Sequence, residues 1–139
     1  MAERLAIEPG SAVMKTEYVF LADGQPIQSS VSYEPLDLTE GAEIELPEEG
    51  RYTNTGVITR MDAIDVHITR VSEEVTIRPP RAAESDLLQI EPGVHVFHIR
   101  RTFSTDERPV ETADIIIPGD RYSLTYEFRV TDEDDPATV

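Results

Sequence analysis

The chain of 139 residues contains no cysteine and no tryptophan, and it has no long hydrophobic run. The absence of cysteine excludes disulfide frameworks, thiolate metal sites and cysteine nucleophiles. No apolar run approaches the roughly 18 residues of a membrane span, and the first residues lack the hydrophobic region of a signal peptide. We therefore expect one cytoplasmic domain, large enough to bury a core without disulfides or metals.

Basic residues are scarce, with 12 Lys and Arg against 28 Asp and Glu and a net charge of −16. Such a surface repels phosphate backbones, so the chain by itself is not expected to bind DNA. Lys15 is the single lysine, and the other basic residues are all arginine. This bias either supplies planar guanidinium groups for anion recognition or reflects genome composition.

Catalytic and cofactor-binding motifs are missing as well. The chain has no G-x-S-x-G nucleophile elbow, P-loop, H-E-x-x-H or Rossmann glycine pattern. His95 and His98 lie three positions apart on a predicted strand and therefore face opposite ways, which disfavours a shared metal site. The sequence thus predicts no catalytic residue, no metal site and no cofactor.

An internal repeat is the strongest positive signal. Residues 5–35 and 88–118, aligned 83 positions apart, share ten identical pairs in 31, where chance gives about two. The identical pairs begin with Leu5 and Leu88 and end with Pro35 and Pro118. Two copies of one supersecondary unit, about 2–35 and 85–118, predict a pseudo-symmetric fold with a feature between its halves.

Turn residues and apolar periodicity divide the chain into elements. We predict helices over 2–7, 57–64 and 81–89, hairpins over 12–34 and 94–117, a strand over 66–77 with a bulge near 71–74, and a last strand over 121–130. Residues 35–50 are an acidic connection. One domain covers 1–130, and 131–139 are expected to be a disordered acidic tail. The fold class is α+β, with an antiparallel sheet of about six strands covered on one side by two or three helices.

Strand parity places Arg101 on an otherwise apolar face with Ile99 and Phe103, at the position that Tyr18 holds in the first repeat. A buried guanidinium must be paired, so the partner of Arg101 is either an anionic ligand or an internal carboxylate such as Glu111. Residues 50–55 precede the predicted central helix. They serve either as ordinary N-caps or as an anion site at a helix start.

Taken in order along the chain, these features resemble the UTRA domain, the effector-binding part of HutC-type GntR transcription regulators, over residues from about 2 to 128. No single motif is strong, but the ordered set is. It consists of Ala2, Leu5, Ile7, Pro9, Gly10, Asp23, Gly24, Pro26, Ile27, Gly50, Thr53, Glu84, Leu88, Ile90, Pro92, Gly93, Arg101, Arg108, Pro109, Val110, Glu111, Asp120, Arg121 and Tyr122.

The resemblance implies a chorismate-lyase-like fold that binds a small metabolite in a cleft and forms homodimers. In the family, ligand binding changes the spacing of attached winged-helix DNA-binding domains, which precede the UTRA domain. Here the UTRA pattern begins directly after Met1. We therefore interpret the chain as an excised or truncated domain that contacts DNA only through a missing winged-helix domain and does not contact a membrane.

The resemblance also implies candidate effector-binding residues. The Arg-x-Arg pair of sugar-phosphate-sensing members corresponds to Tyr18 and Phe20, and a glutamate after the first hairpin turn falls on Ser30. Aromatic surface thus replaces half of a phosphate clamp, which favours an apolar or aromatic ligand with one polar end. The candidates are Tyr18, Phe20, Ser30, Arg51, Thr53, Asn54, Arg101 and Glu111.

Two other functions remain open at the sequence level. A chorismate-lyase-like enzyme shares the expected architecture, although fold analogy is a weak basis for assigning catalysis. A stand-alone module that heterodimerises with full-length regulators would explain the missing DNA-binding part.

Overall fold

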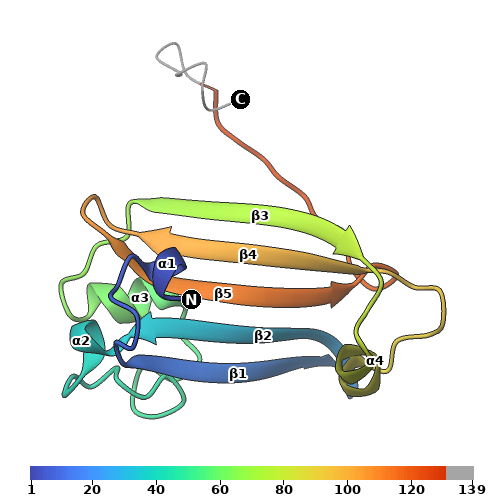
Figure 1. Cartoon of the computed structure of the whole chain (residues 1–139), viewed down its shortest axis with the longest axis horizontal. Helices are drawn as coiled ribbons and strands as arrows, with labels where there is room; N and C mark the ends of the chain where they lie inside the picture. Colours follow the sequence, from blue (N-terminus) through green and yellow to red (C-terminus); the bar gives the residue numbers. More distant parts are fainter. Residues whose placement is uncertain (131–139) are drawn as a thin grey trace.

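Two β-hairpins form most of a five-stranded antiparallel sheet in the computed structural model, which describes residues 1–130 (Figure 1). The first hairpin consists of β1 (Val13–Ala22) and β2 (Gln25–Pro35), and the second of β4 (Val96–Ser104) and β5 (Pro109–Pro118). The remaining strand, β3 (Arg70–Arg78), pairs with β4 at one edge. The strand order is β1-β2-β5-β4-β3, so the two hairpins meet through β2 and β5. The α+β class and the antiparallel sheet are confirmed.

The sequence repeat is reproduced in the backbone. Val13 pairs with Pro35 in the first hairpin, and Val96 pairs with Pro118 at the matching position of the second. Each hairpin also has a register shift at the same place, after Phe20 and after Phe103. The two hairpins are therefore related by an approximate two-fold axis that passes between β2 and β5.

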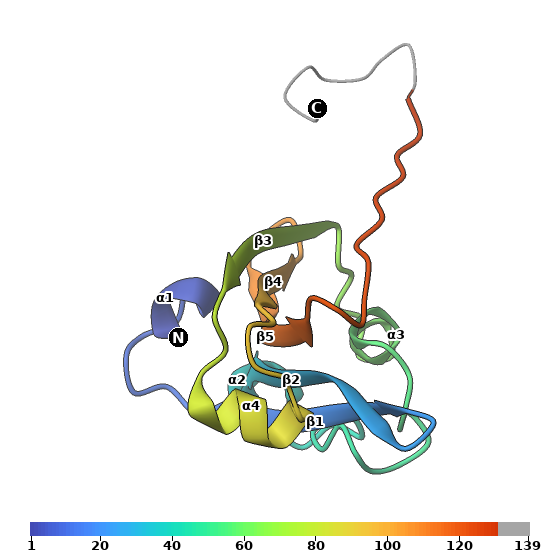
Figure 2. The ribbon, with the colours of Figure 1, turned by 90° about the vertical axis from the view of Figure 1, so that its right-hand side faces the viewer.

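The four short helices are α1 (Ala2–Leu5), α2 (Leu36–Thr39), α3 (Val57–Asp62) and α4 (Ala82–Leu88). The helix that opens each repeat packs on a strand of the other, because α1 contacts β5 and α4 contacts β2. Figure 2 shows α1 and α4 on one side of the sheet and α3 on the other. The helices therefore lie on both faces, and the expectation that they cover one side was wrong.

Three apolar clusters hold these layers together. Leu88 of α4 packs with Val96 and Ile116, while Met61 of α3 packs with Ile44 and Val110. The third cluster, on the α3 side of the sheet, consists of Ile99, Ala113, Ile115 and Ile117. Within residues 1–130, none of the helices has the length and hydropathy needed to span a bilayer.

Two predicted strands differ from the structure. β3 begins at Arg70 rather than at residue 66 and pairs with β4 without a register shift in its length, so the predicted bulge was wrong. The apparent change of parity arises because Val66 and Ile68 precede the strand and pack beside α3 instead. Residues 121–130 alternate as a strand should, yet they pair with no strand of the described chain. The predicted tail 131–139 lies outside the described residues.

Candidate functional site

A cavity of about 790 Å³ lies between α3, with the loop that precedes it, and the adjacent face of the sheet. We call this face of the sheet the cleft face. The middle row of this face crosses all five strands, and each residue in it is the cross-strand partner of the next. From β1 to β3 the row consists of Tyr18, Ser30, Ile115, Ile99 and Val75. The predicted placement of Arg101 on one face with Ile99 and Phe103, at the position that Tyr18 holds in the first repeat, is confirmed by this register.

An aromatic wall on β1 forms one side of the cavity. The rings of Tyr18 and Phe20 lie 5.9 Å apart and are inclined by 19°, so they stack along the strand. Burial and the nearby carboxylate of Glu48 raise the pKa of the Tyr18 hydroxyl, which therefore stays protonated near neutral pH. Phe20 is 46% exposed, as expected of a side chain that lines an open cavity.

A buried carboxyl group lies opposite this wall. Glu111 of β5 is 0% exposed, and the Ser32 hydroxyl of β2 donates a 3.0 Å hydrogen bond to its Oε1. Its Oε2 has no hydrogen-bond partner in residues 1–130. Burial raises the pKa of Glu111 to about 7, against the opposing effects of Arg101 and of the Ser32 hydrogen bond. The carboxyl of Glu111 thus titrates near neutral pH, and its Oε2 retains unused hydrogen-bonding capacity.

Arg101 supplies a positive charge to the same cavity. Its guanidinium carbon lies 4.7 Å from the ring centre of Phe103, a cation–π geometry, and its Nε has no hydrogen-bond partner within the described chain. Arg101 and Glu111 form no ion pair within 4.0 Å among the described residues, and they are not cross-strand partners, because Arg101 pairs with Ala113 and Glu111 with Phe103. The internal ion pair considered from the sequence is therefore not formed at contact distance.

A second arginine reaches the cavity from α3, and both of its terminal nitrogens are paired, while its Nε has no hydrogen-bond partner in residues 1–130. Arg60 donates two hydrogen bonds to the Glu34 carboxylate, at 2.8 and 3.0 Å, and a third to the Ile44 carbonyl. The side chains of Arg60 and Glu34 are only 5% and 2% exposed. This bidentate pair fixes α3 over β2. The sequence analysis did not identify it, although Arg60 lies three residues after Val57 on the apolar side of the helix.

The loop before α3 has a different structure from either sequence interpretation. Gly56, rather than a threonine or asparagine, precedes the helix as its N-cap. The hydroxyls of Thr53 and Thr55 donate instead to the carbonyls of Gly50 and Tyr52, at 2.7 and 2.5 Å. These bonds close consecutive turns and orient Asn54 and Thr55 toward the cavity.

The structure brings six of the eight candidate residues to this cavity: Tyr18, Phe20, Ser30, Asn54, Arg101 and Glu111. Thr53 does not line it, and Arg51 forms an exposed ion pair with Glu43 at 3.0 Å. Gln28, Ser32 and Glu48, which are not among the eight candidates, also line the cavity. Strand parity carried a signal for Gln28 and Ser32, since both alternate with Ser30 on the cleft face.

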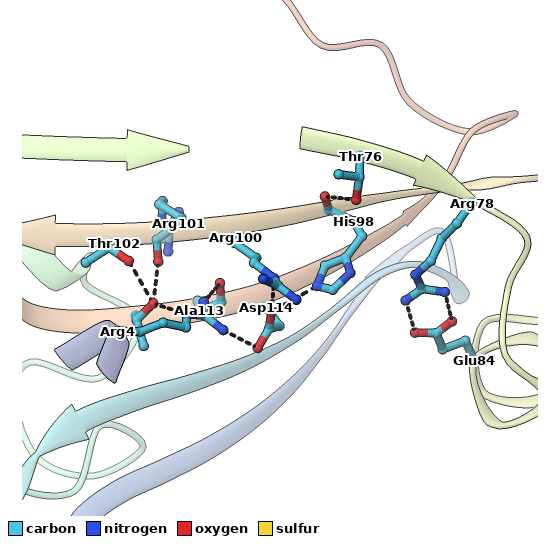
Figure 3. A network of polar contacts seen from close by, with 11 residues as sticks. Arg4, Thr76, Arg78, Glu84, His98, Arg100, Arg101, Thr102, Ala113 and Asp114 are labelled. Carbon is cyan, nitrogen blue, oxygen red and sulfur yellow. Dashed lines mark hydrogen bonds and ion pairs between the residues drawn. The ribbon is translucent and has the colours of Figure 1, made fainter. Parts of the chain in front are cut away.

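The opposite face of the sheet carries a network of hydrogen bonds and ion pairs between its side chains (Figure 3). Arg4 of α1 donates to the carboxylate of Asp114 at 2.9 Å, and His98 lies 2.9 Å from the other oxygen of that group. Although burial alone would raise it, the pKa of Asp114 is lowered by the hydrogen bonds from His98 and Arg4. Figure 3 also shows Arg78 joined to Glu84 by two hydrogen bonds, each of 2.8 Å.

Comparison with known proteins places the chain in a family. A family model described as the UTRA domain matches residues 1–123. Two curated relatives, uncharacterized HTH-type transcriptional regulators of Streptomyces coelicolor and Rhizobium meliloti, are each 30% identical over 133 and 131 residues. The matches cover 95% and 91% of this chain but only 49% and 51% of those proteins. The chain thus spans about half the length of the curated relatives.

Solved structures agree with the fold. A crystal structure of a protein assigned to the GntR family of transcriptional regulators is 47% identical, with a TM-score of 0.88, and the match covers 94% of this chain and 53% of that one. The C-terminal domain of the histidine utilization repressor of Pseudomonas syringae has a TM-score of 0.75 at 23% identity, over 93% of this chain and 87% of that one. The effector domain of PhnF from Mycobacterium smegmatis has a TM-score of 0.78 at 20% identity, covering 93% and 77%.

Proposed function

The chain belongs to the UTRA domain family of GntR-type transcription regulators, and we propose that it senses a small-molecule effector in the cavity between α3 and the cleft face. Effector binding in this proposal modulates DNA binding by an attached winged-helix domain of the HutC type. The proposal includes a homodimer and a cytoplasmic location. It assigns no catalytic residue, no metal and no cofactor.

The observation that carries the proposal is the unsatisfied polar chemistry around Glu111. Buried polar groups in folded proteins are nearly always hydrogen-bonded, and an unpaired one costs about 1–3 kcal/mol. Glu111 Oε2 and Arg101 Nε both lack partners in residues 1–130, and both residues line the same cavity. A ligand that supplies these hydrogen bonds recovers the free energy, which makes this cavity the best candidate for a binding site.

The lining also favours a class of ligand. Tyr18 and Phe20 offer a stacked aromatic surface, while the polar groups converge on the opposite side around Glu111, Ser32 and Arg101. Ligand sites combine predominantly apolar walls with a few placed polar groups that fix orientation. We therefore propose a planar or apolar ligand whose single polar end faces Glu111 and Arg101, rather than a phosphosugar.

Binding is tested by thermal shift with aromatic and heteroaromatic acids, amines and alcohols, and with sugar phosphates as a comparison set. A ligand at 100 times its dissociation constant adds about 2.7 kcal/mol to stability. Phe20→Ala is expected to weaken binding of any hit about tenfold, because it removes one aromatic contact of about 1.5 kcal/mol. Leu21→Ala is the matched control, since Leu21 is also exposed but does not line the cavity.

The outcomes discriminate between ligand classes and sites. Stabilisation by sugar phosphates alone would contradict the proposed ligand class. Equal loss of affinity in Phe20→Ala and Leu21→Ala would place the site elsewhere. If no compound of either set changes the melting temperature, the effector-binding proposal loses its support.

A lyase activity has a separate test. Such an enzyme needs cationic groups for two substrate carboxylates, whereas Arg60 is already engaged by Glu34 and only Arg101 of the two cavity arginines is unpaired in the described structure. We expect incubation with chorismate to give no 4-hydroxybenzoate by chromatography. Its appearance at a rate proportional to protein concentration would establish the enzyme instead.

A further inference from the structure

A second cavity, of about 540 Å³, lies between α1 and α4 on the face of the sheet opposite the cleft face. Its volume falls within the range of small-molecule sites. We call it the axial cavity, because its lining includes Val31 and Asp114. These two residues hold equivalent positions in the internal repeat and pair with each other across β2 and β5. The approximate two-fold axis therefore passes between them, and the cavity lies where the two halves of the domain meet.

Positive charge is concentrated in the axial cavity. Its lining contains four arginines and three carboxylates, which leaves eight basic and 25 acidic residues elsewhere in the sequence. The arginines are Arg4, Arg78, Arg81 and Arg100. Because the chain as a whole has a net charge of −16, most of its surface repels anions, whereas this cavity attracts them. Guanidinium groups also match the geometry of a carboxylate or a phosphate.

Around Asp114 the cationic groups outnumber the carboxylate. Figure 3 shows Arg4, His98 and Arg100 gathered around this side chain. One carboxylate oxygen lies 2.9 Å from Arg4 and the other lies 2.9 Å from His98. The Nε of Arg100 lies 3.9 Å away, beyond hydrogen-bond distance. Glu74, the cross-strand partner of Arg100, forms no ion pair with it within 4.0 Å among the described residues. Arg100 is thus available to an anion in the cavity.

The end of the cavity near α4 has a similar excess of cationic groups. Arg78 donates two hydrogen bonds of 2.8 Å to the Glu84 carboxylate, and the backbone N–H of Arg81 donates a third. The Arg78 Nε remains buried without a hydrogen-bond partner in residues 1–130. The third carboxylate of the lining, Glu17, is paired with Lys15 at 3.0 Å. All three carboxylates are therefore engaged, and the groups left without a partner are cationic.

The other half of the cavity is apolar, and the repeat explains the difference. Leu87 of α4 holds the position equivalent to Arg4 of α1. In the same way, Val31 holds the position equivalent to Asp114. Leu87 is 49% exposed and lies one turn after Ala83 of α4, which also lines the cavity. The two-fold axis thus relates a charged half of the cavity to an apolar half.

We propose that the axial cavity binds a second small molecule, distinct from the effector, which carries one anionic group on an apolar body. The anionic group, a carboxylate or a phosphate, contacts Arg100, and the apolar body lies against Val31 and Leu87. Arg100 and Val31 flank Asp114 in one row of the sheet, so they are two strand spacings apart, or about 10 Å. An octyl chain has about this length. This inference does not rest on the proposed function, which concerns the other face of the sheet.

Isothermal titration calorimetry with octanoate and octyl phosphate tests the site. We expect at least one of these anions to bind with a dissociation constant of about 1 mM or below. Octanol lacks the charge and acetate lacks the apolar body, and each should bind about tenfold more weakly. Octanol binding as tightly as octanoate would overturn the anionic class of ligand. Acetate binding as tightly as octanoate would overturn the role of the apolar half, and no binding of either octyl anion would overturn the site.

Paired variants test the two halves of the cavity. Arg100→Gln should weaken binding about tenfold, because a hydrogen bond to a charged group is lost. Arg70→Gln is its control, since Arg70 is exposed on the same face of β3 as Arg78 but does not line the cavity. Leu87→Ser should weaken binding about fivefold through lost apolar contact. Leu21→Ser is the control for this change, because Leu21 is 61% exposed and lies outside the cavity.

The variants also separate this site from the cavity between α3 and the cleft face. Phe20 lines only that other cavity, so Phe20→Ala should leave octanoate binding unchanged. Weaker binding in Phe20→Ala but not in Arg100→Gln would place octanoate beside α3, which overturns this site and leaves the proposed function intact. Equal weakening by Arg100→Gln and Arg70→Gln would show general charge attraction and would overturn the site as well. Melting temperatures of all variants verify that each is folded.

Discussion

Two carboxylates on β5 show how differently the two faces of the sheet are built. Asp114, on the face covered by α1 and α4, receives hydrogen bonds from Arg4 and His98, which lower its pKa. Glu111, on the cleft face, receives one hydrogen bond from Ser32 and has a pKa raised to about 7, chiefly by burial. Both oxygens of the Asp114 carboxylate have partners among the side chains of its own face, whereas Oε2 of Glu111 on the cleft face has no hydrogen-bond partner in residues 1–130. A carboxylate satisfied by a structural network and an unsatisfied one at the candidate site thus lie three residues apart on one strand.

Breaking the closed ion pair of the cleft face should have the largest effect. Arg60→Met leaves the Glu34 carboxylate buried without its partner, and we expect the free energy of unfolding to fall by about 3–5 kcal/mol. Urea denaturation measures the change. The double variant Glu34→Gln/Arg60→Met should recover part of the loss, because it removes the orphaned charge. Arg51→Met is the surface control, since its pair with Glu43 is exposed and should contribute at most about 1 kcal/mol. Equal losses of unfolding free energy in Arg60→Met and Arg51→Met would contradict the distinction between the buried and the exposed ion pair.

Replacing Glu111 with an uncharged residue should change how the free energy of unfolding depends on pH. The pKa of Glu111 is about 7 in the folded state, whereas its usual value is 4.5. Between pH 4.5 and pH 7 the carboxyl is therefore protonated in the folded state and ionised in the unfolded state. Stability should therefore fall as pH rises from 4.5 to 7, by about 3 kcal/mol in total. Glu111→Gln removes this contribution and should be the more stable protein above pH 7.

Urea denaturation of both proteins between pH 4.5 and 8 provides the measurement. Glu48→Gln is the control, because it changes an exposed carboxylate at the same cavity. Parallel pH profiles of the wild-type protein and Glu111→Gln would rule out the raised pKa.

The contribution of Asp114 to the free energy of unfolding should depend on pH with the opposite sign to that of Glu111, and the effect should be smaller. Since the pKa of Asp114 is lowered in the folded state, its contribution is present above pH 3.8 and is lost as pH falls through the lowered value. Asp114→Ala removes hydrogen bonds from Arg4 and His98 and should cost about 1–3 kcal/mol at pH 7. Thermal denaturation between pH 2 and 7 should show the difference from the wild-type protein shrinking below pH 3.8. A difference that grows on acidification would mean that Asp114 is not the stabilised carboxylate.

Patterns that act within a few residues were predictable from the sequence. The hairpins, the faces of their strands and the repeat follow from turn residues and a period of two. The placement of Arg101 and Glu111 near one cavity followed from strand parity together with the family resemblance. By contrast, Thr53 and Thr55 look like helix caps, yet their hydroxyls bond to Gly50 and Tyr52, because the helix begins later. Residues 121–130 have the alternation of a strand, but alternation alone does not name a partner.

The sequence by itself determined two equivalent hairpins and which of their side chains share a face, because strand geometry is local. The tertiary structure decided that the hairpins meet through β2 and β5, and only this pairing brings Ser32 of the first repeat to Glu111 of the second. It likewise decided that α3 crosses the cleft face and delivers Arg60 to Glu34. Such contacts join residues far apart in the chain, where burial and the satisfaction of polar groups across the whole fold select the arrangement.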